Sequence, residues 1–541
     1  MTFSNSQSRY DFLVYRATPA GIMAAITASR LNLRTALIEP SDRIGGMMTS
    51  GLNAVDILNT TLVNGVVREF FRIVRDEYDL PYLPARIESK VALRVFRGML
   101  AESKVELFQK RDIRFVSRDS ARIINCTLND NRILASRWWV DASYEGDLIN
   151  LAHLRYRLGR EAADEYGESF AGRQPFRSML PWASGYNVSP HTDTGKLLPY
   201  IAPVSRNPVG SADDEVQSYC LRPTLTNRPD NRIPITPPKD FDFGEFELFR
   251  RISKGIRTGR VASKDIPMMG TTFKSAYFNL AELPNGKFDM NSGPAAPLNN
   301  PMLTQGWVTA TYDKRQEMAH AFSRYTRALL YFIQNDSSVP QGVRDFFGEF
   351  GLPADEYGST DHIPPDVYVR EGRRLVNRHI FRQQDIESGG ACRADAICEA
   401  KYHLDCKPVH WRANHSGTNI VREGMFFTQD AYRYSLPKWI ILPEPADCRN
   451  FFSVCGVAAT HVAFGSIRME PTWMELGSAA AIMAYLANQQ RCPVDDIPGE
   501  AVTKLRDERF FQWPAPRFLR NKLRDKAVSY YRKISGRRDS A

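Results

Sequence analysis

The stretch DFLVYRATPAGIMAAITASRLNLRTALIEPSDRIGG, residues 11–46, decides the fold of the chain. Its apolar run, residues 11–15, predicts a short buried strand. The small residues that follow predict a tight turn and a helix, and residues 34–40 predict a second strand. A strand, a turn, a helix and a strand within about thirty residues form a βαβ unit. The sequence therefore predicts an α/β fold that begins with a Rossmann-like unit.

The tight turn of this unit lacks two of the three glycines of the dinucleotide-binding fingerprint. The first glycine allows the turn, the second lets the backbone approach a pyrophosphate, and the third allows close helix packing. The corresponding residues are Arg16, Thr18 and Gly21. A long side chain at the first position strains the turn or blocks the pyrophosphate, whereas a guanidinium can also pair with a phosphate. These alternatives stay open at the level of the sequence.

Other residues of the unit favour FAD as its ligand. Glu39 ends the second strand, 23 positions after Arg16, where a carboxylate accepts hydrogen bonds from ribose hydroxyls. The amides at a helix start bind pyrophosphate through unpaired N–H groups and the helix dipole. We therefore predict that the unit binds the ADP half of FAD. The predicted ligands in this unit are Thr18, Pro19, Ala20, Gly21, Glu39, Pro40, Gly45, Gly46 and Met47.

Two later stretches extend the predicted cofactor site. DASYEGDLI, residues 141–149, has the form of a strand that ends in a polar turn, which places Asp141 and Gly146 at the carboxyl edge of the sheet. THVAFGSIRMEPTWMELGSAAA, residues 460–481, predicts a turn at Gly465 and Ser466 before a helix whose N-terminal amides face the flavin ring. Both pairs are therefore predicted cofactor ligands.

The amino-acid composition changes in the middle of the chain. From about residue 173 to 365, segments rich in Pro, Asn and Asp appear, such as RPDNRIPITPPKDFDF. We interpret this part as an α+β substrate domain inserted into an FAD-binding domain that is split in sequence. The predicted divisions are 8–160 and 371–490 for the two parts of the FAD-binding domain, 161–370 for the inserted domain, and 491–541 for a basic C-terminal extension.

The charge, the cysteines and the hydropathy of the chain limit the classes of protein to which it can belong. The net charge is +10, and residues 517–541 carry nine Lys or Arg against two Asp or Glu, so basicity belongs to the tail. A solvated terminal helix is the favoured interpretation of the tail, and weak contact with a membrane or an anionic partner is the alternative. No nucleic-acid partner is expected.

The eight cysteines form no CxxC pair, which predicts reduced thiols and no metal site. The chain has no signal-like segment and no apolar run of about 18 residues, so we expect a cytoplasmic protein.

Spaced blocks along residues 10–490 resemble the FAD-dependent oxidoreductase family whose members are often labelled xanthan lyase-like. The blocks include TPAGI, IGGMMTSGL, DASYEGDL, VQSYCLRPTLTN, LPNGKFDMN, YVREGRRLV, AYRYSLPK and THVAFGSIRMEPTWMELG. The resemblance implies a flavoprotein with a split FAD-binding core and an inserted substrate domain. The chain departs from the family at four positions: Arg16 stands at a usual Gly, Cys220 at a usual Asn, Gly372 at a usual Ser or Ala, and Lys407 at a frequent His.

The predicted chemistry is that of a flavin, which accepts hydride or single electrons. We predict that Arg468 steadies negative charge on the flavin and that His461 is the acid or base, because the ordinary pKa of histidine is about 6.5. The predicted substrate residues are Arg222, Asp289, Arg373 and Tyr432, and Gln217, Tyr219, Asn291, Arg370, Arg374 and Arg433 lie in similar blocks. Several arginines favour a carboxylate, a phosphate or another polar small molecule.

Three functions remain open at this point. The favoured one is a dehydrogenase or oxidase that moves hydride from a polar small molecule to flavin N5, because the sequence has no second fingerprint for NAD(P)H. A flavin monooxygenase that uses NAD(P)H is the alternative among enzymes. From a different class, the chain is a flavin-less binding or scaffold protein on the same fold, with Arg16 as the disabling change.

Overall fold

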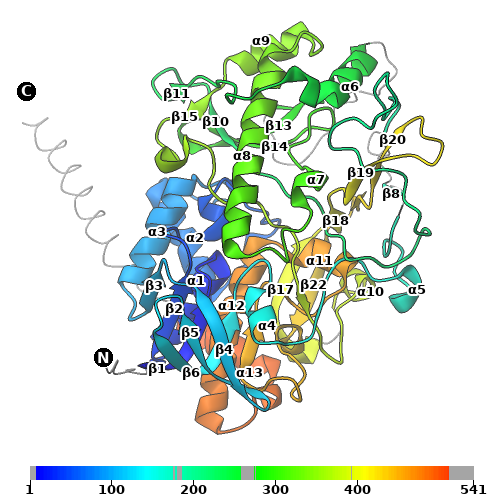
Figure 1. Ribbon diagram of the computed structural model, residues 1–541. Helices are drawn as coiled ribbons and strands as arrows, with labels where there is room; N and C mark the ends of the chain where they lie inside the picture. The colour runs from blue at the N-terminus through cyan, green and yellow to red at the C-terminus, as the bar shows by residue number, and fades with distance from the viewer. Residues whose placement is uncertain are drawn as a thin grey trace, which may run out of the picture.

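The computed structural model describes residues 8–174, 177–178, 185–257, 273–274, 276–390 and 393–510. A seven-stranded sheet takes strands from both ends of the chain, and its N-terminal strands lie at the lower left of Figure 1. In order across the sheet its strands are β3 (Glu106–Gln109), β2 (Thr35–Glu39), β1 (Ser8–Tyr15), β6 (Ile133–Asp141), β5 (Arg122–Leu128) and β4 (Ile113–Asp119), with β23 (Phe451–Ser453) also paired to β6. Strands β3, β2, β1, β6 and β23 run parallel, and β4 and β5 are antiparallel. The predicted α/β, Rossmann-like fold is confirmed.

Strand β6 joins the two parts of the sheet. Its first residues pair with β5 in the antiparallel sense, and its last residues, Trp139 to Asp141, pair in parallel with Phe451 to Ser453 of β23. About three hundred residues separate β6 from β23 in the chain. The sheet is therefore split in sequence, as predicted. The exact divisions at residues 160, 370 and 490 stay predictions.

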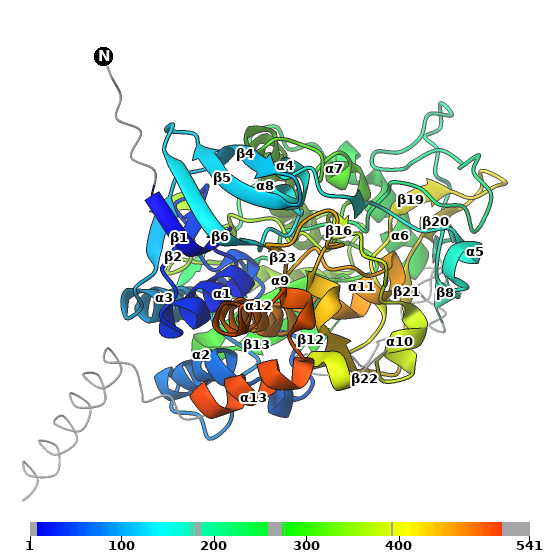
Figure 2. The ribbon, with the colours of Figure 1, turned by 90° about the horizontal axis from the view of Figure 1, so that it is seen from below.

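Helices α1 (Pro19–Arg30) and α12 (Glu470–Gln490) pack side by side on one face of the sheet (Figure 2). Small residues dominate both helices, and Thr18 caps α1 by accepting a hydrogen bond from the Gly21 amide at 3.2 Å. The closest approach is at Gly477, where a Cβ would lie 2.2 Å from the Ala20 carbonyl oxygen. Glycine at this position lets the two helix backbones touch.

We expect Gly477→Ala to destabilise the protein by at least about 1 to 3 kcal/mol, because the added methyl meets rigid backbone on a neighbouring helix. The control is Gly342→Ala in helix α9 (Gln341–Gly348), where no atom lies within 4 Å of an added Cβ. Alanine favours a helix, so the control should be neutral or slightly stabilising. Denaturant unfolding measures both changes. Equal free energies of unfolding for the two variants would contradict the packing described.

A second region covers the carboxyl edge of the sheet. Its core is a four-stranded antiparallel sheet, ordered β10 (Thr224–Thr226), β14 (Lys287–Ser292), β13 (Phe278–Leu283) and β12 (Phe273–Lys274), beside α6 (Glu247–Arg257), α8 (Tyr312–Asn335) and α9. Helix α8 begins beside the first region and runs toward this sheet (Figure 1). At its start, Arg315 donates to both carboxylate oxygens of Asp147, at 2.6 and 2.8 Å. The ion pair fixes the second region against the loop that follows β6.

Smaller sheets and helices complete the described chain. Three sheets pair β17 (Ala396–Tyr402) with β22 (Tyr432–Pro437), β7 (Tyr156–Arg157) with β16 (Arg374–Leu375), and β11 (Arg232–Ile233) with β15 (Leu352–Pro353). Two more pair β18 (Asp405–Cys406) with β21 (Phe426–Phe427) and β8 (Arg177–Ser178), and β19 (His410–Ala413) with β20 (Ile420–Glu423) and β9 (Gly185–Tyr186). The remaining helices of four or more residues, 3-10 turns aside, are α2 (Gly65–Glu77), α3 (Ser89–Ala101), α4 (Asp147–Leu151), α5 (Ala163–Tyr166), α7 (Pro301–Thr304), α10 (Gln383–Glu387), α11 (His461–Ile467) and α13 (Gly499–Phe510).

The C-terminal extension begins as a packed helix. Arg506 of α13 lies 3.8 Å from Glu475 of α12, and a Cβ on Gly499 would lie 2.4 Å from the Asp395 backbone. The predicted basic helix of residues 517–541 lies outside the described residues. Among the helices of the described ranges, none combines the length and the apolar character needed to cross a membrane.

Candidate functional site

Strands β1, β2 and β6 end together at the carboxyl edge of the sheet, where parallel α/β sheets bind ligands. A cavity of about 60 Å³ lies at this edge. We call it the nucleotide cavity, and its wall includes Arg16, Thr18, Glu39, Gly46 and Tyr144. Three predicted FAD ligands, Thr18, Glu39 and Gly46, thus meet at one site with the turn residue Arg16.

Three predicted glycines shape the backbone around the nucleotide cavity. A Cβ on Gly21 would lie 2.1 Å from the Arg16 carbonyl oxygen and 3.0 Å from the Ala142 side chain. Gly45 and Gly46 have φ of +91° and +46°, which glycine adopts without strain, and a Cβ on Gly46 would lie 2.3 Å from the Tyr144 hydroxyl. Each position thus requires glycine.

Glu39 and Arg16 form an ion pair at the nucleotide cavity. The Glu39 carboxylate is 3% exposed and accepts hydrogen bonds from the amides of Ala17 at 2.9 Å and Ser41 at 3.0 Å. The Arg16 Nε lies 3.4 Å from the same carboxylate. Burial opposes the Arg16 charge, but the carboxylates of Glu39 and Glu145 raise its pKa well above the ordinary value. Arg16 is therefore a permanent cation beside the predicted ribose acceptor.

The backbone of Arg16 is strained. Its φ is +78°, a conformation that favours glycine and costs other residues on the order of 1 kcal/mol. The strained turn keeps the geometry of the fingerprint although the glycine is missing. The side chain is 19% exposed, so Arg16 reaches solvent from the wall of the cavity.

The residues of the nucleotide cavity fit the ADP group of FAD in their chemistry. They supply a helix start, a carboxylate at the end of the second strand, and a glycine pair that brings backbone close to the ligand. The cavity itself has room for only a few water molecules. Binding of the nucleotide therefore requires the Arg16 side chain to move away from Glu39.

Asp141 and Gly146 shape the turn after β6 and do not line the nucleotide cavity. The buried Asp141 carboxylate accepts hydrogen bonds from the amides of Ser143 at 2.8 Å and Ile149 at 2.9 Å, and burial raises its pKa to about 6. Gly146 has φ of +69°, and its Cβ would lie 2.9 Å from Arg373. Both residues thus hold the loop that carries Tyr144.

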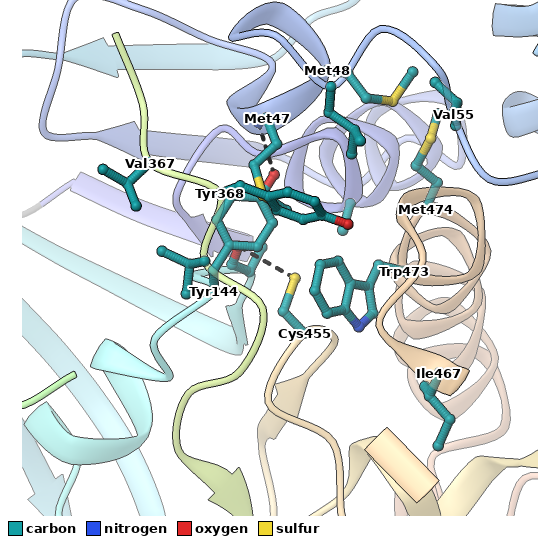
Figure 3. Packing of buried hydrophobic residues seen from close by; sticks show 14 of the residues in the cluster. Met47, Met48, Val55, Tyr144, Val367, Tyr368, Cys455, Ile467, Trp473 and Met474 are labelled. Carbon is teal, nitrogen blue, oxygen red and sulfur yellow. Dashed lines mark hydrogen bonds between the residues drawn. The ribbon is translucent and has the colours of Figure 1, made fainter. Parts of the chain in front are cut away.

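An aromatic cluster lies between the nucleotide cavity and α12. Figure 3 shows Met47, Tyr144, Tyr368, Cys455 and Trp473 pointing toward one another from separate segments. The Tyr144 hydroxyl accepts a hydrogen bond from the Met47 amide at 3.1 Å, donates one to Glu470, and the Tyr144 ring lies 5.5 Å from that of Trp473. Burial raises the pKa of Glu470, the first residue of α12, to about 8. The cluster is an apolar wall that ends at the start of α12.

A larger cavity of about 300 Å³ lies beyond this cluster. Its polar lining residues are Asp56, Arg86, Arg222, Asn279, Asp289, Asn291, Tyr368, Arg370, Tyr402, Asp405, Lys407 and Arg468. The segment 367–370 separates the two cavities, because Val367 and Val369 line the nucleotide cavity whereas Tyr368 and Arg370 line the larger one. The two cavities therefore share a wall formed by one segment of the chain.

The larger cavity contains two of the four predicted substrate residues. Arg222 and Asp289 both line it and pair with each other at 2.7 Å. Arg373 instead donates to the Glu145 carbonyl oxygen at 3.1 Å, and Tyr432 lies opposite Tyr402 on the β17–β22 pair. Neither of these two residues lines a cavity described here, so their role in binding stays a prediction. Arg468 lines the larger cavity and bonds to the Asp405 carboxylate at 2.8 Å.

Asp56, Asp405 and Tyr402 line the larger cavity and are not among the residues predicted for the site. Asp56 follows the glycine pair in an irregular segment, without periodicity that marks a face. The Asp405 and Lys407 side chains flank Cys406, and such alternation indicates two residues on one face of a short strand. This alternation is the only feature of the sequence that could have placed Asp405 in the larger cavity.

His461 lies in α11 and lines neither cavity. Its Nδ1 is 2.9 Å from both carboxylate oxygens of Glu371, and its Nε2 is 3.5 Å from the Cys406 sulfur. Burial opposes the charge, but the Glu371 carboxylate raises the pKa of His461 to about 10. The acid or base role of His461 stays a prediction, and this geometry favours a buried imidazolium that ties α11 to residue 371.

We expect the free energy of unfolding to fall as the pH rises from about 6.5 to 10. The folded protein holds the His461 proton more tightly than the unfolded chain, so this stabilisation is complete below the unfolded pKa and is lost through the folded pKa. Chemical denaturation at pH 6 and pH 9.5 measures the fall. In His461→Asn the fall should be smaller by at least about 1 kcal/mol. An identical fall in the two proteins would contradict this assignment.

Gly465 and Ser466 occupy a different setting from the one predicted. Both lie inside α11, which spans His461–Ile467, so the predicted turn at these residues is wrong. A Cβ on Gly465 would lie 3.0 Å from the Asp405 carbonyl oxygen, and the Ser466 hydroxyl is 2.9 Å from that of Tyr434. The polar, small-residue pattern that suggests a turn here serves close packing of a short helix against β18 and β22.

The family model for FAD dependent oxidoreductases matches residues 11–508 of the chain. The chain belongs to this family, and FAD is its cofactor. The narrower label, xanthan lyase-like, stays a prediction. No curated protein matches the chain.

Solved structures with a similar fold include several flavoenzymes. The geranylgeranyl bacteriochlorophyll reductase-like protein of Thermoplasma acidophilum is 10% identical, with a TM-score of 0.33 over 94% of this chain and 85% of that one. The anhydrotetracycline hydroxylase OxyS of Streptomyces rimosus is 15% identical, with a TM-score of 0.24 over 28% of this chain and 35% of that one. The amino acid oxidase NikD is 12% identical, with a TM-score of 0.22 over 29% and 56%. With TM-scores this low, the assignment rests on the family match.

Proposed function

We propose that the chain is a dehydrogenase or oxidase whose substrate is a polar small molecule bound in the larger cavity. FAD, when bound, supplies the hydride acceptor. The observation that carries the proposal is the shared wall, because residues 367–370 present alternate side chains to the nucleotide cavity and to the larger cavity. A substrate in the larger cavity would be one segment of the chain away from the predicted cofactor site and surrounded by polar side chains.

Residues of the larger cavity have the chemistry for orienting a substrate and accepting a proton. Arg468 is held by the Asp405 carboxylate at 2.8 Å and donates to the Tyr368 hydroxyl at 3.2 Å, which fixes its positive charge. Asp56 is a carboxylate in the same wall, and burial raises its pKa above the ordinary value. A carboxylate with a raised pKa is a better proton acceptor. We assign Asp56 the role of general base.

The Arg16–Glu39 ion pair in the small nucleotide cavity opposes FAD uptake, and a flavin-less binding protein is the function left if that ion pair keeps the cofactor of the family out. The two functions differ in one direct test. Purified holo-protein is mixed without oxygen with sets of hydroxy acids, amino acids and sugars, and the flavin band near about 450 nm is followed. Bleaching by a small molecule alone is expected. Bleaching only by NAD(P)H would favour a monooxygenase, and a protein that takes up no FAD would favour the binding protein.

A further inference from the structure

The larger cavity has more cations than anions in its wall. Five cationic side chains line it: Arg86, Arg222, Arg370, Lys407 and Arg468. Three carboxylates line it: Asp56, Asp289 and Asp405. The wall therefore has an excess of two positive charges, which attracts an anionic ligand.

Most of these charges are already paired. Arg222 lies 2.7 Å from Asp289, and Arg468 lies 2.8 Å from Asp405. Lys407 shares the Asp405 carboxylate, at 3.1 Å. One carboxylate between two cations leaves part of the charge of Lys407 uncompensated.

Arg370 has no carboxylate partner within salt-bridge distance in the described part of the chain. It is 1% exposed, and its two terminal nitrogens donate to the Ser218 carbonyl oxygen at 2.9 Å and to the Cys220 sulfur at 3.3 Å. Its guanidinium carbon lies 4.2 Å from the centroid of the Tyr368 ring. Its Nε is buried and donates to no described acceptor. A buried guanidinium held in place with an unused donor is costly unless a ligand completes it.

We propose that Arg370 binds a carboxylate of the substrate in the larger cavity, with Lys407 as the second cation. The planar guanidinium presents parallel N–H donors that match a carboxylate, and the Tyr368 ring fixes its plane. The volume of about 300 Å³ is at the lower end of ligand pockets, which limits the ligand to a small organic acid. This inference rests on the proposed function in one respect, namely that the larger cavity is the substrate site.

Calorimetric titration of the purified holo-protein tests the proposal. The probes are malonate, succinate and gluconate, with malonamide as a neutral analogue and inorganic phosphate as a second anion. We expect at least one of the three acids to bind, malonamide not to bind, and phosphate to bind more weakly. Failure of all three acids overturns the proposal, and so does tighter binding of phosphate.

Two variants test whether the bound acid contacts Arg370 and Lys407. Arg370→Gln should weaken its binding by tenfold or more, since one charge-assisted contact is lost. Because Arg370 is buried, Lys407→Gln is the second variant; its side chain is 19% exposed and its loss should also weaken binding. The matched control is Arg155→Gln, whose exposed arginine pairs with Asp447 outside the cavity and should leave binding unchanged. Unfolding midpoints identify any variant that is not folded, and equal binding in folded wild type and Lys407→Gln overturns the proposal.

The flavin content of each sample separates this inference from the proposed function. Binding of the acid by protein that takes up no FAD supports the carboxylate site and contradicts the redox function. Flavin reduction by a neutral small molecule, together with no binding of any acid, contradicts the carboxylate site and leaves the redox function standing.

Discussion

Replacing Arg16 by glycine is expected to tighten FAD binding by about tenfold to a hundredfold, which corresponds to about 1.4 to 3 kcal/mol. In the wild type, the Arg16 Nε lies 3.4 Å from the Glu39 carboxylate, which is the predicted acceptor for the ribose hydroxyls. The nucleotide must displace this ion pair from a cavity of about 60 Å³. Arg16→Gly removes the competing cation and enlarges the cavity.

The matched control for this change is Arg16→Ala. Alanine also removes the guanidinium but keeps a Cβ at φ of +78°, so it should bind FAD nearly as tightly as the glycine variant. It should be less stable than the glycine variant by about 1 kcal/mol, because only glycine adopts this φ without strain. Titration of the FAD-free protein with FAD, followed by quenching of flavin fluorescence, measures the affinities. Weaker binding in both variants would mean that Arg16 holds a phosphate, contrary to our expectation.

Asp56→Asn is expected to lower kcat by about a hundredfold to ten-thousandfold, because it removes the assigned general base from the larger cavity. The asparagine is nearly isosteric and leaves the lining polar, so FAD content and the unfolding midpoint should stay at the wild-type level. Since burial raises the pKa of Asp56, the wild-type rate should fall as the pH decreases through that pKa and the carboxylate is protonated.

The control for Asp56 is Asp193→Asn, at a fully exposed carboxylate remote from both cavities. It should leave kcat and its pH dependence unchanged. Rates are measured with the small molecule that bleaches the flavin in the anaerobic test. A full rate in Asp56→Asn, with the same pH profile as the wild type, would rule out Asp56 as the base.

The βαβ unit could be predicted from the sequence because its signals are local. The spacing between the turn, Gly21 and Glu39 is set by one strand and one helix, and the structure places these residues as expected. The ion pair between Arg16 and Glu39 could not be predicted from the sequence. The sequence shows that the first glycine of the fingerprint is missing. The contact between the Arg16 side chain and Glu39 depends on the rotamer of a long, flexible side chain, which a sequence does not specify.

The larger cavity could be predicted only in part, because it is built from distant segments. Asp56, Asp289 and Asp405 lie far apart in the chain and meet in one wall. In the same way, the partner of His461 is Glu371, 90 residues earlier, and its carboxylate raises the pKa of the buried imidazole to about 10. Such contacts leave no periodic pattern in a single sequence.

One departure from the family is explained by the backbone. Gly372 stands at a position where Ser or Ala is usual, and a Cβ there would lie 2.3 Å from the Tyr144 carbonyl oxygen. The loop that carries Tyr144 and the segment that carries Arg370 and Arg373 therefore approach more closely than a side chain at residue 372 would allow. The glycine lets the segment that follows the wall between the two cavities pack against the loop after β6.

The absorption spectrum of the purified protein, before and after addition of FAD and removal of the excess, tests the central claim most directly. The account predicts flavin bands near about 370 and 450 nm in the wild type, and a higher flavin content in Arg16→Gly at the same FAD concentration. A wild-type protein and an Arg16→Gly variant that are both folded, colourless and unable to take up FAD would contradict it.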